Sequence, residues 1–102
     1  MINYPKSADE FDELLKGELV LVDFFTTWCG PCKMLGEELI SLDHDNVPGL
    51  LIVKVDAEEV TELSRRYRIQ AVPTLMLFKS GELVKHTNGY HDKSELLKFI
   101  EK

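Results

Sequence analysis

Apolar residues recur at helical spacing near the start of the chain. Between Phe11 and Leu15 they fall on one side of a helix, because positions three or four residues apart share a face. Ser7 is followed three residues later by Glu10, the pattern of a capping box at a helix N-terminus. The pattern therefore predicts a helix that begins after Ser7 and stops near Gly17.

Two further runs are almost continuously apolar and carry one charge each. Residues 19–25 contain Asp23, and residues 50–55 contain Lys54. A strand with apolar residues at both odd and even positions is covered on both faces, as in the centre of a sheet. We therefore predict two central strands, in which each lone charge needs a compensating partner or a functional reason.

The segments after these strands return to helical spacing. A turn at 26–27 leads into a helix that begins near Cys29, has Pro31 in its first turn and is ended by Asn-Val-Pro-Gly at 46–49. A short helix follows the second strand. Its apolar and small positions are Val60, Leu63, Ser64 and Tyr67.

The last third of the chain predicts a hairpin and a final helix. Residues 74–79 and 83–87 flank Ser80-Gly81, a turn pair, and Asp92 can cap a helix. Alternating strands and helices that end in a hairpin predict an α/β fold, with a mixed sheet covered by helices on both faces. Connections are short and no repeat occurs, so we expect one domain over residues 1–102.

Composition and charge narrow the function classes. The 102 residues are 44% apolar, which is enough for one core without added cross-links. The net charge of −6, with basic residues scattered among acidic ones, disfavours nucleic acid as a partner. No leader-like start and no run near the roughly 20 apolar residues of a membrane span occur. We expect a cytoplasmic protein with no membrane partner.

The two cysteines are the strongest chemical signal. Cys29 and Cys32 stand three positions apart at the junction of a strand and a helix, where they can form and break a bridge. So short a loop removes little entropy from the unfolded chain, which disfavours a purely stabilising role. Free N–H groups at the helix start lower the pKa of Cys29 and make it the candidate nucleophile. Cys32, one turn deeper, is the candidate resolving thiol.

Two other interpretations of the cysteine pair remain. Zinc would require two more ligands, and His44, His86 and His91 lack a paired spacing with the dithiol. An inert, buried pair of thiols is the second alternative. We expect no bound metal.

The segment 22–34 reads Val-Asp-Phe-Phe-Thr-Thr-Trp-Cys-Gly-Pro-Cys-Lys-Met, and 71–74 reads Ala-Val-Pro-Thr. These segments, with Gly89 and Lys93, closely resemble the thioredoxin family over essentially the whole chain. The resemblance implies the thioredoxin fold, with a central mixed sheet of four to five strands flanked by helices on both faces. It also implies reduction of protein disulfides through a redox-active Cys29–Cys32 pair. No bound cofactor is expected, because NADPH supplies the electrons through a thioredoxin reductase.

The resemblance assigns roles to further residues. Asp23 matches the family's buried acid, which would exchange a proton with Cys32, and Lys54 matches a lysine near that acid. A structural ion pair and a lysine that merely reaches solvent are the alternatives. Pro73 matches a proline with a cis peptide bond, an ordinary trans proline being the alternative. The substrate-binding residues implied are Trp28, Gly30, Pro31, Val72, Pro73 and Gly89.

The chain also departs from the family pattern. Phe25 and Thr26 replace a common Trp-Ala pair, and Glu37 replaces a proline. Arg68 and Ala71 replace glycines, which would cost roughly 1 kcal/mol or more wherever the backbone is left-handed.

Gly-Pro between the cysteines resembles the thioredoxin pattern, and this resemblance implies a reductase that acts on protein disulfides. A redox-independent binding module and a more oxidising, isomerase-like protein are the alternatives. With no assembly signature in the sequence, we expect a monomer.

Overall fold

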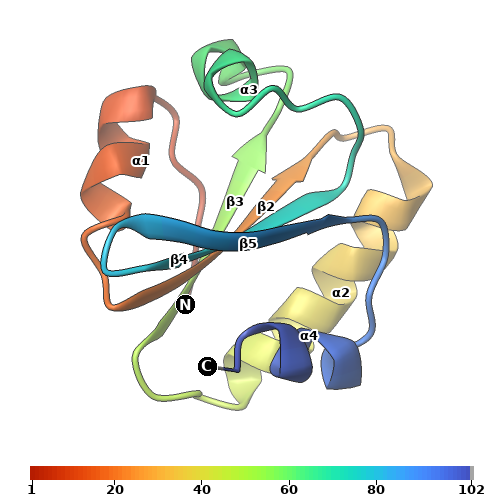
Figure 1. Cartoon of the computed structure of the whole chain (residues 1–102). Helices are drawn as coiled ribbons and strands as arrows, with labels where there is room; N and C mark the ends of the chain where they lie inside the picture. The colour runs from red at the N-terminus through yellow and green to blue at the C-terminus, as the bar shows by residue number, and fades with distance from the viewer. Residues whose placement is uncertain (102) are drawn as a thin grey trace.

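The computed structural model describes residues 1–101. Five strands and four helices follow one another along the chain (Figure 1). They are β1 (Ile2–Asn3), α1 (Ala8–Leu14), β2 (Leu19–Phe25), α2 (Gly30–His44), β3 (Leu50–Asp56), α3 (Thr61–Arg66), β4 (Thr74–Lys79), β5 (Glu82–Asn88) and α4 (Lys93–Phe99).

The strands form one mixed sheet in the order β1-β3-β2-β4-β5. β3 is parallel to both β1 and β2, whereas β4 is antiparallel to both β2 and β5. The predicted fold class is therefore confirmed, with five strands. The sequence analysis missed β1, because two residues are too few to show a period and they pair only with β3.

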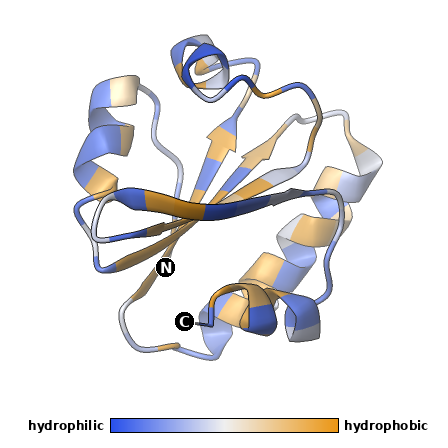
Figure 2. Ribbon diagram, viewed as in Figure 1, coloured by the Kyte–Doolittle hydropathy of each residue, from blue (hydrophilic) through white to orange (hydrophobic). Residues whose placement is uncertain are grey.

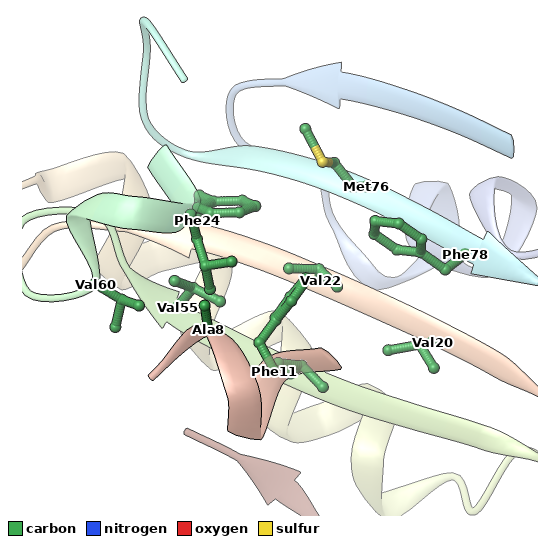
Figure 3. Packing of buried hydrophobic residues seen from close by; sticks show 11 residues of the cluster. Ala8, Phe11, Val20, Val22, Phe24, Val55, Val60, Met76 and Phe78 are labelled. Carbon is green, nitrogen blue, oxygen red and sulfur yellow. The ribbon is translucent and has the colours of Figure 1, made fainter. Parts of the chain in front are cut away.

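Helices cover both faces of the sheet, as predicted. One core cluster joins α1 and α3 to the even-numbered residues of β2, and Figure 3 shows Phe11, Val22 and Phe78 gathered there. The other cluster joins α2 and α4 to the opposite face, through Leu21 and Ile52. Figure 2 shows the central strands as mostly apolar, which follows from their burial on both sides.

Side-chain caps set the helix starts. The Ser7 Oγ accepts a hydrogen bond from the Glu10 N–H at 3.2 Å, while the Glu10 carboxylate accepts from Lys6 N–H rather than from Ser7. Asp92 and Glu95 form a complete capping box at α4. No helix among residues 1–101 is both long and apolar enough to cross a membrane.

Candidate active site

Cys29 occupies the N-cap position of α2. Its backbone is extended, at φ −89° and ψ 116°, and its Sγ accepts a hydrogen bond from the Cys32 N–H at 3.1 Å. A sulfur thus takes the place that a serine or aspartate oxygen holds at most helix starts. Gly30 and Pro31 form the first turn, where proline is tolerated because that N–H has no partner in the helix.

Cys29 and Cys32 are joined by a disulfide, with their Cα atoms 5.2 Å apart. Both side chains are buried, at 6% and 2% exposure. The spacing predicted that these sulfurs can bridge, and the structure confirms it. His44, His86 and His91 do not join a group of three possible metal ligands anywhere in residues 1–101.

The loop before β4 lies against the disulfide. The Cys29 Sγ is 3.8 Å from the Val72 carbonyl oxygen, and the Val72–Pro73 peptide bond is cis. Hydrogen bonds fix this loop from both sides: Thr74 Oγ1 donates to the Ala71 carbonyl at 2.6 Å, and Gly89 N–H donates to the Pro73 carbonyl at 2.9 Å. The structure therefore brings three of the expected substrate-binding residues to one place: Val72, Pro73 and Gly89.

Trp28 stands on the surface beside the disulfide. Its side chain is 68% exposed, and its indole N–H donates to a Glu58 carboxylate oxygen at 3.1 Å. Gly30 and Pro31 are also exposed on this side of the site. The sequence analysis did not identify Glu58; its only signal is its place two residues after β3, at the same end of the sheet as Cys29.

Asp23 lies under α2, inside the molecule. Its side chain has no solvent exposure, and neither carboxylate oxygen has a hydrogen-bond partner within residues 1–101. It is on the sheet face of Leu21, which packs against α2, because alternate strand residues share a face. Removal from water raises the pKa of Asp23 to about 7, and the nearby charge of Lys54 opposes part of this rise.

Lys54 is the register partner of Asp23 on β3. Its Nζ lies 4.0 Å from Asp23 Oδ2, and its side chain is only 13% exposed. The ammonium also lies 4.6 Å from the Phe25 ring centroid, a cation–π distance. A side-chain carbon at Gly36 would approach the Nζ to 3.1 Å, so α2 packs closely over this charge.

The residues that depart from the family pattern lie in different environments in the structure. Phe25 provides the ring beside Lys54, and the buried Thr26 hydroxyl has no hydrogen-bond partner within residues 1–101. Glu37 is exposed. Arg68 has a left-handed backbone at φ 52°, whereas Ala71 does not.

Comparison with known proteins agrees with this site. The thioredoxin family model matches residues 3–102. Thioredoxin from Chlamydia trachomatis is 41% identical over 96 residues, which cover 94% of this chain and 93% of the relative.

Two solved structures are similar over nearly the whole chain. A mutant thioredoxin from Halobacterium salinarum has a TM-score of 0.90 and 34% identity, covering 98% of this chain and 88% of that one. The oxidised form of mitochondrial thioredoxin 3 from Saccharomyces cerevisiae has a TM-score of 0.87 and 33% identity, covering 97% and 92%. The chain therefore belongs to the thioredoxin family and is a thiol-disulfide oxidoreductase, a protein-disulfide reductase with a Cys29–Cys32 bridge.

Proposed function

We propose that Cys29 is the nucleophile and Cys32 the resolving thiol. In the reduced protein the Cys29 thiolate attacks one sulfur of a partner disulfide, forms a mixed disulfide and releases the partner's other sulfur as a thiolate. Cys32 then loses its proton and attacks the Cys29 sulfur. The internal bridge closes, the partner leaves with its second thiolate, and two electrons have passed to the partner.

The observation that carries this assignment is the position of the Cys29 sulfur at the N-cap. The Cys32 N–H already points at it, and the positive end of the α2 dipole stabilises a negative charge there. Cys32 lies inside the first turn and is the more buried of the two. A thiolate is therefore stabilised at Cys29 more than at Cys32.

Asp23 is proposed as the base that takes the proton from Cys32. It faces α2 from below, and a carboxyl with a pKa of about 7 can both accept and return a proton near neutral pH. Lys54 has a secondary role, since its charge holds part of the Asp23 population ionised.

The exposed surface around Cys29 is proposed to bind extended segments of substrate proteins. The Val72 N–H has no hydrogen-bond partner within residues 1–101, so it is free to pair with a peptide backbone. Trp28, Gly30, Pro31, Pro73 and Gly89 would form the walls. Backbone pairing and apolar contact give broad recognition rather than recognition of one sequence.

The proposal also includes the compartment, the oligomeric state and the source of electrons. Residues 1–102 act as one domain and a monomer in the cytoplasm, without a bound cofactor, and a thioredoxin reductase returns electrons from NADPH to the Cys29–Cys32 bridge. The family match supports disulfide-containing substrates and the reductase as partners.

The test is NADPH-coupled reduction of insulin by this chain with a compatible thioredoxin reductase. Cys29→Ser should reduce the rate to that without the chain, and Cys32→Ser should accumulate mixed disulfides that reducing agent dissolves. Wild-type turnover by Cys29→Ser would contradict the proposal. Mixed disulfides on Cys29→Ser instead of Cys32→Ser would reverse the two roles. Partner binding unchanged after both cysteines become serine would favour a binding module.

A further inference from the structure

A hollow lies beside the active-site loop, on the sheet face that carries α1 and α3. It has a volume of about 470 Å³, within the range of small-molecule sites. The connection between α3 and β4 forms one wall and the edge strand β5 the other; Figure 1 shows both elements in teal and blue.

Strand register explains why these side chains meet. Thr74 pairs with Asn88 and Met76 pairs with His86, so all four residues share one face of the β4–β5 ladder. A β-bulge at Leu77/Phe78 shifts the register, which brings Leu83 onto that face as well. The floor is therefore apolar at Met76 and Leu83 and polar toward Asn88.

The hollow is basic, although the chain as a whole has a net charge of −6. Arg66 and Arg68 line it together with His86, and no aspartate or glutamate lines it. The Arg66 guanidinium donates a hydrogen bond to an Asp12 carboxylate oxygen at 2.7 Å and forms an ion pair with it. Arg68 has no ion pair within residues 1–101. The His86 imidazole provides a donor N–H in either protonation state.

The backbone of Arg68 gives a second, independent indication. Arg68 follows the end of α3 in a left-handed conformation, φ 52°, which is unfavourable for any residue with a side-chain Cβ and natural for glycine. Such backbone conformations persist only where the surrounding structure holds them, and they cluster at functional sites. Here Arg68 lines the basic hollow without an ion-pair partner within residues 1–101.

We propose that this hollow binds a small organic anion. An aromatic or aliphatic body would lie on Met76 and Leu83, and a carboxylate or phosphate would receive hydrogen bonds from Arg68 and His86. Such a molecule would also touch the hydrogen-bonded group Ala71, Thr74 and Asn88.

The test uses 1-naphthyl phosphate as the probe and the oxidised full chain, followed by NMR in a phosphate-free buffer. We expect saturable shifts at the amides of Arg68, Met76 and His86. 1-Naphthol, which lacks the charge, and inorganic phosphate, which lacks the ring, should each bind at least about tenfold more weakly.

Amino-acid substitutions test whether the probe binds in this hollow or to any exposed arginine. Arg68→Gln and His86→Gln should each weaken binding, the former by about tenfold. Arg65→Gln removes a neighbouring exposed arginine that does not line the hollow, and should leave the affinity unchanged. Arg68→Gln and His86→Gln each test the site separately. If one variant fails to fold, the probe affinity of the other still decides the question.

Three results would overturn the proposal: no saturation at millimolar probe, equal effects of Arg68→Gln and Arg65→Gln, or shifts centred on Trp28 and Gly30. The last would mean that the probe simply occupies the apolar surface around Cys29. Insulin reduction by Arg68→Gln is a separate readout, so failure of the anion site would leave the proposed redox function standing.

Discussion

The ammonium of Lys54 lies 4.0 Å from the Asp23 carboxylate on the adjacent parallel strand, too far for a hydrogen bond. The lysine therefore compensates only part of the cost of burying the acid, and the pKa of Asp23 stays at about 7. This incomplete compensation leaves a carboxyl that can change its protonation state near neutral pH. It also makes the stability of the fold dependent on pH.

Asp23→Asn should stabilise the protein at high pH. The folded-state pKa of Asp23, about 7, is above its ordinary value of 3.8, so the folded state binds the proton more tightly. Stability therefore falls as pH rises from about 4 to about 7 and stays low above that. The variant should gain on the order of 3 kcal/mol at pH 8 and little at pH 4.

Urea unfolding of the oxidised form at both pH values measures this gain, since neither bridged cysteine titrates there. Asp9→Asn is the control: that carboxyl is exposed, and its loss should change stability by less than about 0.5 kcal/mol at either pH. An equal gain from Asp23→Asn at pH 4 and pH 8 would show that ionisation of Asp23 is not the cause.

Lys54→Met should raise the pKa of Asp23 further. The lysine charge favours the ionised carboxylate, and methionine keeps the apolar stem that packs near Phe25 without the charge. Titration of the Asp23 side-chain carbon by NMR reports the change. Lys85→Met, which removes an ammonium that lies over Phe99, should leave the Asp23 titration where it is. A lower midpoint in Lys54→Met would contradict the assigned ion pair.

The lone charges in the apolar runs 19–25 and 50–55 predicted that Asp23 and Lys54 each need a partner, and the family resemblance predicted that the two lie near each other. The sequence predicted the disulfide because both cysteines are local to one helix start. The Trp28–Glu58 hydrogen bond could not be predicted from the sequence, since it joins exposed side chains 30 residues apart. Nothing local marks that pairing; it depends on where the β2 and β3 ends meet.

Thr26→Val and Thr74→Val should change stability in opposite directions. Both side chains are 4% exposed, but the Thr26 hydroxyl has no partner within residues 1–101. The Thr74 hydroxyl donates to Ala71 at 2.6 Å and accepts from Asn88 at 2.7 Å. Valine should therefore stabilise at position 26 by about 1 kcal/mol and destabilise at position 74 by about 1 to 3 kcal/mol.

Thermal unfolding of the two threonine variants at one pH gives the change in the free energy of unfolding for each. Because the substitution and the burial are matched, the difference between them isolates hydrogen bonding. Loss of stability in Thr26→Val would mean that a water molecule satisfies that hydroxyl.

Arg68→Gly should stabilise the fold. The Ile69 N–H bonds the Ser64 carbonyl at 2.9 Å across the end of α3, which is the Schellman arrangement, and Arg68 holds the left-handed position where glycine is usual. A glycine at position 68 would have indicated the end of the helix in the sequence, whereas an arginine does not. Relief of the left-handed conformation, less the entropy that glycine adds to the unfolded chain, should give about 0.5 to 1 kcal/mol.

Arg65→Gly makes the same chemical change three residues earlier, inside α3, where glycine costs up to about 1 kcal/mol. Urea midpoints should therefore move upward for position 68 and downward for position 65. If both variants lose stability, the Arg68 side chain makes a stabilising contact that outweighs its backbone conformation. The comparison thus shows whether the Arg68 side chain stabilises the fold or whether its left-handed backbone costs stability.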